Sequence, residues 1–205
     1  IDPGEVEPDH EVFEHRHVWK LAWNLKGATD AMVENLVRRQ AGDLLAQARA
    51  AYETEGYEVQ TTRLATVPFP SLLGEGHIAQ LPRLAADLSA LLPQVGISYA
   101  SLGPALPASP LSYALIPEAV AASENIFFGG VMAEGGSLHT SAVHACAQVI
   151  VDCAALEPNG FANLRFAALA NVPPGAPFFP AAYWDSDEPA FAIATEAADL
   201  AVEAF

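Results

Sequence analysis

Segments with the residue pattern of β-strands alternate along this chain with segments that have the pattern of α-helices. The expected strands are short stretches that are continuously apolar or alternate between apolar and polar residues. They span residues 12–25, 57–67, 96–102, 125–132 and 164–170. The expected helices span residues 30–55, 78–92, 116–124, 137–156 and 189–205. Because parallel strands need long crossover connections, this alternation predicts an α/β fold with a largely parallel sheet.

Local signals set the expected helix ends and the domain boundary. Gly56 suits the position just past the first helix, where a left-handed residue is common. The run Ser186-Asp-Glu-Pro189 combines a capping side chain, acidic residues and a proline, which predicts a last helix reaching Phe205. That helix has no C-cap signal and the chain begins with Ile, so we expect a piece of a longer protein. Residues 1–11 are expected to be a flexible acidic lead-in to a single α/β domain over residues 12–205.

The chain is strongly acidic. Its 205 residues are 52% hydrophobic, enough to bury the core of one domain. Nine basic residues stand against 25 acidic ones, for a formal net charge of −16. Such a surface repels phosphate backbones and anionic lipids, so we expect neither nucleic acid nor membranes as partners.

Cysteine spacing and hydropathy bear on the compartment. Cys146 and Cys153 are seven residues apart in an expected helix, about 10 Å along its axis, which is too far for a disulfide. No apolar run approaches the roughly 20 residues that span a bilayer, and the acidic N-terminus is unlike a signal peptide. These features predict a cytoplasmic protein with reduced core thiols.

A proline-rich, aromatic loop follows the last expected strand, over residues 171–185. Loops that stay this apolar are typical of stiff walls beside a cleft, and Phe178 and Phe179 are expected to exclude water there. Asn171 stands where the strand ends, a usual place for ligand-binding residues in α/β folds. Arg165, the only Lys or Arg after Arg83, is expected to clamp a carboxylate or phosphate. The alternative for Arg165 is a structural ion pair with one of three acids, Asp152, Glu157 or Glu196.

A glycine-rich stretch over residues 129–141 has the pattern of a strand, a loop and a helix start. Gly135, Gly136 and Ser137 would then bring backbone N–H groups to a helix N-terminus, which favours anions. The spacing is neither G-x-G-x-x-G nor a Walker loop, so nucleotide binding is not indicated. Tight packing of the turn is the alternative interpretation.

Three residues are candidate proton-transfer groups: His139, Glu134 and Glu196. A helix N-terminus favours the neutral imidazole of His139, the form that acts as a base. Against this, one helical face is expected to be buried and would make His139 a core histidine; it contains His139, Val143, Cys146, Ile150 and Cys153. We predict no metal site, and no cofactor motif, catalytic triad or zinc signature is visible.

Two stretches resemble a known bacterial and archaeal family, the domain of unknown function numbered seven hundred and eleven. They are Asn159-Gly-Phe-Ala-Asn-Leu-Arg165 continuing through Ala182, and Ala190-Phe-Ala-Ile-Ala-Thr-Glu196. The likeness is sharp over residues 125–205 and looser over residues 44–110, and residues 1–43 depart from the pattern. The resemblance implies an α/β barrel similar to pyruvate formate-lyase and other glycyl radical enzymes, of which this chain would be the N-terminal half. Radical chemistry is not implied, since both cysteines fall inside an expected helix rather than at a strand tip.

We therefore expect a small-molecule enzyme of hydrolase or lyase type that binds a small anionic metabolite. Its cleft would lie between the Gly129–Ser137 and Asn171–Pro180 loops. The alternatives are a metabolite-binding or regulatory domain without chemistry, and a structural subunit of a larger assembly. Alanine-rich helices favour close packing, so we expect a homo-oligomer or association with a missing C-terminal half.

Overall fold

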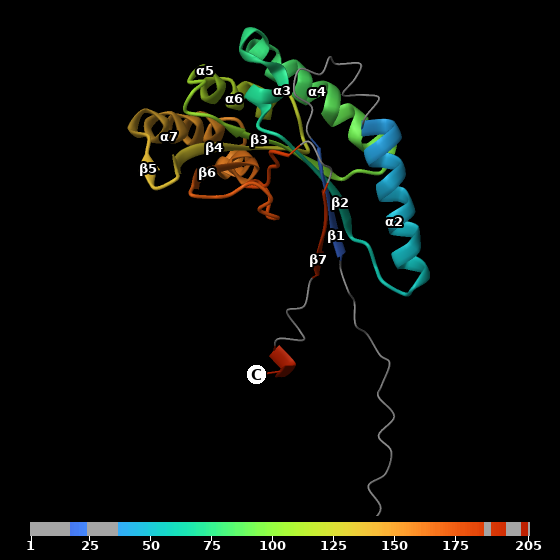
Figure 1. The fold of residues 1–205 in the computed structure, drawn as a ribbon. Helices are drawn as coiled ribbons and strands as arrows, with labels where there is room; N and C mark the ends of the chain where they lie inside the picture. Colours follow the sequence, from blue (N-terminus) through green and yellow to red (C-terminus); the bar gives the residue numbers. More distant parts are fainter. Residues whose placement is uncertain (1–16, 24–36, 187–189, 196–201, 205) are drawn as a thin grey trace, which may run out of the picture.

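An open and mostly parallel β-sheet runs through the protein, seen in a computed structural model that describes residues 17–23, 37–186, 190–195 and 202–204 (Figure 1). The longer strands are β1 (His17–Trp23), β2 (Thr61–Thr66), β3 (Tyr99–Ala105), β4 (Ile126–Glu134), β6 (Phe166–Ala170) and β7 (Ala190–Thr195). Neighbouring strands follow the order β6-β4-β3-β2-β1-β7, and the first four of these pairings are parallel. β7 runs antiparallel to β1, and the two-residue strand β5 (Ser137–Leu138) turns back along the end of β4. The predicted α/β class is confirmed, and the described sheet is open rather than closed into a barrel.

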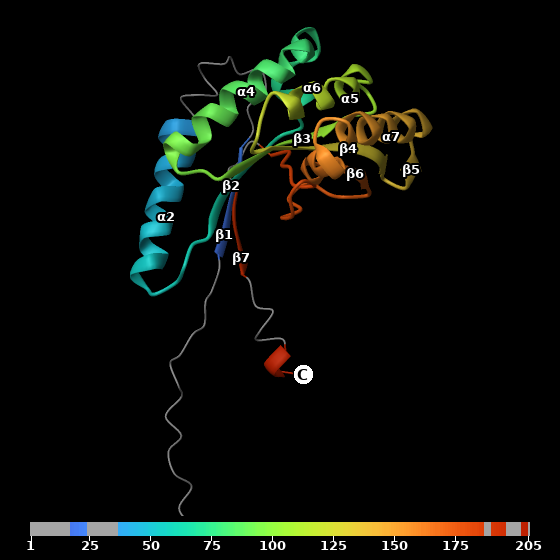
Figure 2. The ribbon, with the colours of Figure 1, turned by 180° about the vertical axis from the view of Figure 1, so that it is seen from behind.

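The helices lie on one side of this sheet, as Figures 1 and 2 show from opposite directions. They are α2 (Asp43–Thr54), which continues a π-helical segment Val37–Gly42, α3 (Phe69–Leu73), α4 (Leu81–Leu91), α5 (Leu111–Ala114), α6 (Ile116–Ala121) and α7 (Thr140–Ala154). Short 3-10 segments occur at Glu75–Gln80, Leu92–Val95 and Pro158–Arg165. The parallel strands follow one another across the sheet in chain order. Right-handed crossovers then place every connecting helix on the same face.

The core fills the space between the helices and this face of the sheet. Phe128 on β4 is fully buried and meets Phe69 of α3 edge to face, with ring centroids 6.1 Å apart. α7 buries Ala142, Cys146, Val149 and Cys153. The face predicted for α7 is therefore partly wrong, because Ile150 is exposed and Val149 takes the core position. The buried positions keep the three- and four-residue spacing of an amphipathic helix.

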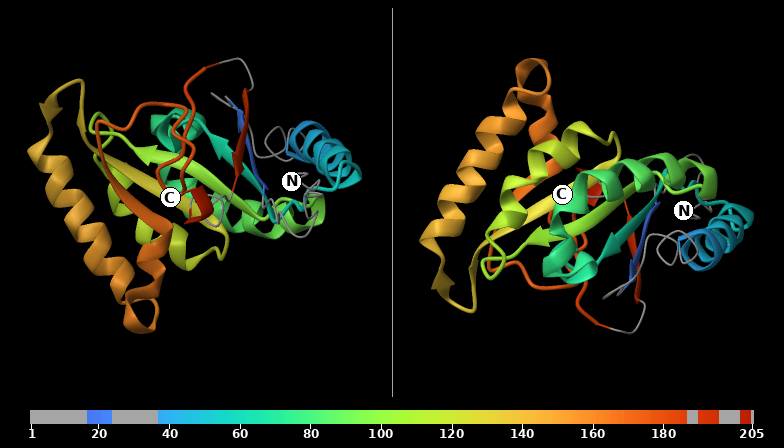
Figure 3. Two further views of the ribbon diagram at one scale, coloured as in Figure 1. Left: turned by 90° about the horizontal axis from the view of Figure 1, so that it is seen from below. Right: turned by 90° about the horizontal axis from the view of Figure 1, so that it is seen from above.

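None of the helices α2 to α7 covers the other side of the sheet, the open face. A long irregular segment, residues 171–186, crosses it from the end of β6 toward β7 (Figure 3). The Ser101 hydroxyl on β3 donates to the Ala182 carbonyl at 2.6 Å. The Trp184 N–H donates to the Thr66 carbonyl at the end of β2, at 3.0 Å. This crossing segment is thus fastened to the middle of the sheet.

Two predicted helical segments have a different structure. Residues 190–195 form strand β7, not the beginning of a helix, because Phe191, Ile193 and Thr195 alternate with alanines and pair along β1. Ser137 belongs to the β4–β5 hairpin, and α7 begins three residues later. The lead-in over residues 1–11 lies outside the described residues.

Both cysteines are free thiols buried in the core, as predicted. Burial raises the pKa of Cys146 and of Cys153 to about 11. Over the described ranges, no helix is both long and apolar enough to cross a membrane.

Candidate functional site

The glycine-rich stretch serves two separate purposes in the structure. Gly129 and Gly130 lie inside β4, where a Cβ would come within 3.0 Å of Leu169 and 2.8 Å of the Cys146 sulfur. These two glycines allow close packing. Gly135 and Gly136 instead form the β4–β5 turn with φ of 56° and 78°, and a Cβ on either would meet nothing within 4 Å. Consecutive positive φ values are those of a type I′ hairpin turn, which favours glycine.

The same hairpin corrects the predicted helix-terminus anion site. Ser137 pairs with Glu134 across the hairpin, so neither it nor the two turn glycines contributes to a helix N-terminus. His139 is the residue before α7, with extended backbone angles, and its N–H donates to the Met132 carbonyl at 2.9 Å. The short strand between turn and helix therefore separates the glycine amides from the helix dipole.

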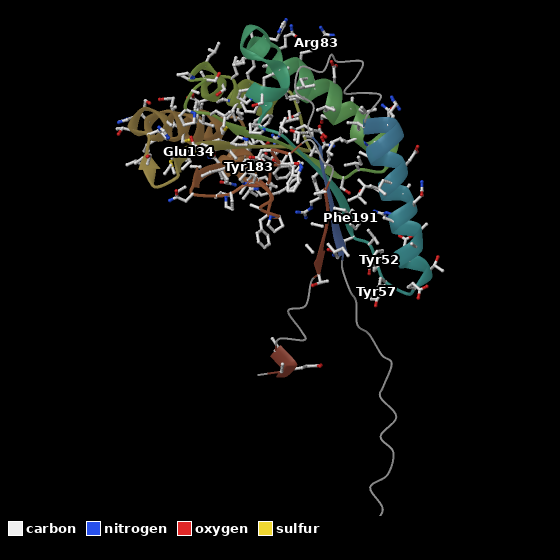
Figure 4. All side chains as sticks on the ribbon, in the orientation of Figure 1. Tyr52, Tyr57, Arg83, Glu134, Tyr183 and Phe191 are labelled. Carbon is white, nitrogen blue, oxygen red and sulfur yellow. The ribbon has the colours of Figure 1, made fainter. Side chains whose placement is uncertain are left out.

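Glu134 and His139 are brought together by this hairpin. Glu134 Oε1 lies 3.6 Å from His139 Nε2, an ion-pair distance when the imidazole is protonated. The Glu134 side chain is 61% exposed, whereas Nε2 is hidden from solvent and makes no hydrogen bond within the described structure. The carboxylate thus faces solvent with an imidazole nitrogen directly behind it. Figure 4 shows Glu134 at the end of β4.

Asn171 joins this arrangement from the end of β6. Its φ is 53°, its N–H donates to the Ala133 carbonyl at 2.8 Å, and its Oδ1 accepts from the Gly136 N–H at 3.4 Å. Asn is among the few residues that adopt this left-handed conformation readily. The predicted residues Glu134, Gly136, His139 and Asn171 therefore meet at the carboxyl end of β4 and β6.

The buried Tyr113 and the half-buried Tyr183 border the same region. The Tyr183 hydroxyl donates to the Val172 carbonyl at 2.8 Å, and the Tyr113 hydroxyl donates to the Val131 carbonyl at 2.7 Å. Burial raises the pKa of Tyr183, and the charges of Asp185 and Glu134 raise it further. Burial is also the main cause of a raised pKa for Tyr113. Both phenols stay neutral at ordinary pH. No local sequence pattern indicates either tyrosine, because each reaches this region through tertiary contacts.

Arg165 lies at the opposite end of β6 from Asn171. Six residues at about 3.3 Å each separate the two by about 20 Å, so they cannot hold one small ligand. The Arg165 guanidinium donates to the carbonyls of Val120 and Ser123 and forms an ion pair with Glu157 at 3.1 Å. Only 12% of the side chain is exposed. Of the two predicted roles, the structure shows the ion pair with Glu157.

The two phenylalanines of the crossing segment also lie away from Glu134. Phe179 packs on Phe127, with ring centroids 5.4 Å apart, and Phe127 lies near the start of β4 while Glu134 ends it. Phe178 is 73% exposed. The crossing segment is long enough to run along the open face, which carries Phe179 to the start of β4. Glu196, the remaining predicted catalytic residue, lies outside the described residues.

A cavity of about 610 Å³ opens near Arg165 rather than near Glu134. Its lining includes Ser123, Glu124, Phe127, Phe161 and Leu164 as well as Arg165. Among the described side chains, no three His, Cys, Asp or Glu residues are grouped to hold a metal ion.

The residues of the predicted cleft therefore lie in three separate places. One group is at the carboxyl end of β4, Arg165 is paired at the amino end of β6, and the aromatic residues are on the open face.

Comparison with known proteins places the chain in a family. No curated protein matches the sequence. A family model, described as Uncharacterised ACR (DUF711), matches residues 21–205, and the chain belongs to that family.

Proposed function

We propose that the protein is a small-molecule enzyme of hydrolase or lyase type whose proton-transfer group is Glu134, supported by His139. The observation that carries this proposal is the 3.6 Å pair formed by the Glu134 carboxylate and the hidden His139 Nε2. The pair stands at the carboxyl end of parallel strands, where α/β folds bind their ligands. The substrate would be a small anionic metabolite, as the sequence led us to expect.

The geometry assigns the two residues different tasks. Glu134, the more exposed, would contact the substrate and exchange the proton. His139 would hold one carboxylate oxygen and, when protonated, balance the negative charge of the substrate. Asn171 would fix the hairpin through the Gly136 N–H, so that Glu134 keeps one orientation. A positioned acid or base of this kind contributes about 10²–10⁴ in rate.

The test is a turnover screen of small carboxylates and phosphate esters with three matched variants. Glu134→Gln should lower kcat about 100-fold or more on any substrate that the wild type converts. His139→Gln should lower kcat less, about tenfold, with a changed pH profile. His144→Gln, an exposed histidine on the same helix, is the control and should keep full activity. Equal activity of the Glu134 and His144 variants would overturn the assignment.

A second candidate, a structural subunit, is favoured by exposed apolar side chains along α7 and the 3-10 segment after it. Val151 and Phe161 are each 64% exposed and Leu164 is 61% exposed. Beside them β6 pairs with β4 on one edge, and no described strand covers its other edge. Apolar patches next to an open strand edge are typical of interaction surfaces.

We further propose that this edge is where the sheet continues into a barrel of the pyruvate formate-lyase type. The in-order strands and one-sided helices support this. Native mass measurements test the association: Val151→Glu should shift an oligomer toward monomer. Leu111→Glu, 57% exposed on α5, is the matched control and should leave the mass unchanged. A monomeric wild type would remove the support for a self-associating subunit.

A further inference from the structure

A row of one cation and three aromatic rings lies on the open face, away from the proposed active site. Arg63 on β2 is the register partner of Tyr99 on β3. The Tyr99 ring meets Phe127 of β4 edge to face, with centroids 5.6 Å apart. Phe179 of the crossing segment packs on Phe127 from above the sheet. Three strands and the crossing segment thus build one cluster.

The Arg63 guanidinium lies over two rings of this cluster. Its Cζ lies 5.5 Å from the Tyr99 centroid and 5.4 Å from the Phe179 centroid. Each ring face attracts the cation by about 0.5–2 kcal/mol, depending on how far water is excluded. Desolvation lowers the pKa of Arg63, although the guanidinium stays charged at ordinary pH. The rings hold the charge in place without neutralising it.

The hydrogen-bonding capacity of Arg63 is largely unused. Its Nε donates to the Thr61 hydroxyl at 3.3 Å, and within the described chain its two terminal nitrogens have no acceptor and no carboxylate partner. The two terminal nitrogens of Arg63 keep some surface that is accessible to solvent. Arg165, by contrast, uses both of its terminal nitrogens on partners inside the protein.

This arrangement is distinct from the Glu134 region. Phe127 and Glu134 are seven residues apart on β4, which corresponds to about 20 Å along the strand. A small ligand cannot reach both. In a chain with net charge −16, a fixed cation with free donors is also where an anion would meet the least repulsion.

We propose that Arg63 is the centre of a binding site for a small carboxylate with a flat apolar body. The terminal nitrogens form a planar fork that matches a carboxylate with two parallel hydrogen bonds. The two rings lie beside the guanidinium, and within the described chain its terminal nitrogens are left to bind the carboxylate. The apolar part of the ligand then rests against Phe179 and Phe127, which a spherical inorganic anion cannot do.

Titration calorimetry with benzoate, acetate and inorganic phosphate tests this site. Benzoate should bind the wild type at least about tenfold more tightly than acetate, and more tightly than phosphate. Arg63→Met should weaken benzoate binding at least about tenfold, and Arg63→Lys should weaken it less, because a lysine keeps the charge without the fork. Arg83→Met, at a 70% exposed position on α4, should change nothing.

Other outcomes would overturn the proposal. Phosphate binding more tightly than benzoate would contradict the carboxylate assignment. Unchanged benzoate affinity in both Arg63 variants would show that Arg63 does not bind the carboxylate. Far-ultraviolet circular dichroism of each variant separates a lost site from a lost fold, and Phe179→Leu gives an independent check. That variant keeps the guanidinium and should still reduce the preference for benzoate over acetate.

Discussion

Arg165, beside the helices, is paired inside the protein, whereas Arg63 on the open face is only partly paired within the described chain. Arg165 bonds to two backbone carbonyls and a carboxylate beside the end of α6. Arg63 on the open face has two aromatic rings and one hydroxyl. Arg63 lies on β2, and Arg165 immediately precedes β6 of the same sheet. The comparison teaches that the partners of an arginine indicate whether it stabilises the fold or binds a ligand. How rare arginine is in that part of the sequence does not indicate this.

The largest effect should come from removing the satisfied arginine. Arg165→Met removes a donor from the Val120 carbonyl, which keeps the Ser123 N–H, and removes the arginine partner of the Ser123 carbonyl and of Glu157, which should cost about 3 kcal/mol. Urea unfolding measures this loss. The control is Arg83→Met, whose exposed ion pair with Asp87 should be worth less than about 0.5 kcal/mol. Similar losses in both variants would break the contrast between paired and exposed arginines.

The next largest effect on stability distinguishes the two glycines inside β4 from the two glycines of the β4–β5 turn. Gly130→Ala would place a Cβ 2.8 Å from the Cys146 sulfur and 3.2 Å from Tyr113, so overpacking should cost about 2 kcal/mol. Gly136→Ala meets no atom and should cost about 1 kcal/mol through its positive φ alone. Adding Cys146→Ala to the Gly130 variant should recover part of the loss. No recovery would mean that packing is not the cause.

The helix-covered side should also be the more sensitive to alkaline pH. Burial raises the pKa of Cys146 and Cys153 to about 11, so the folded protein holds both thiol protons more tightly than the unfolded chain does. The contribution of the two thiols to the free energy of unfolding is intact below about pH 8.5 and is lost as the pH rises toward 11. By pH 10 the loss should be about 1 kcal/mol per thiol. Unfolding curves at pH 8 and pH 10 measure the slope. Cys146→Ala should make it shallower, and an unchanged slope would contradict this origin.

The smallest effect on stability is expected on the open face. Arg63→Met keeps much of the apolar contact with the rings and removes no internal ion pair in the described chain, so stability should change by about 1 kcal/mol or less. Thermal unfolding without ligand measures it. A loss comparable to that of Arg165→Met would make Arg63 a structural residue as well.

The parallel sheet could be predicted because its strands have strong local signals. β2 and β6 fall within the predicted strand stretches, whereas β3 and β4 overlap theirs and run past the predicted ends, β3 through Gly103 and Pro104. β7 was missed because Ser186-Asp-Glu-Pro189 has the features of a helix start and the stretch after it is rich in alanine. The alternation of Phe191 and Ile193 with alanine indicated a strand, and its pairing with β1 decided between the two.

The candidate site was only partly predictable for a different reason. Glu134, Gly136 and His139 are close in sequence, so one hairpin is enough to assemble them. Arg165 and Asn171 are also close in sequence, but a strand separates them, and extended chain carries its ends apart. The position of Phe179 depends on the path of the whole crossing segment, and the role of Arg63 depends on that position. No local pattern contains such information.

The pairing of β7 with β1 has a mechanical consequence. His17 is the partner of Thr195, so the chain enters β1 and leaves β7 at the same end of this ladder, as Figure 1 shows. Tension applied between His17 and Thr195 therefore breaks the hydrogen bonds of the ladder one pair at a time rather than all together. Among the described pairings, this ladder joins the strands that are most distant along the sequence, so it is the last of these pairings that synthesis allows to form.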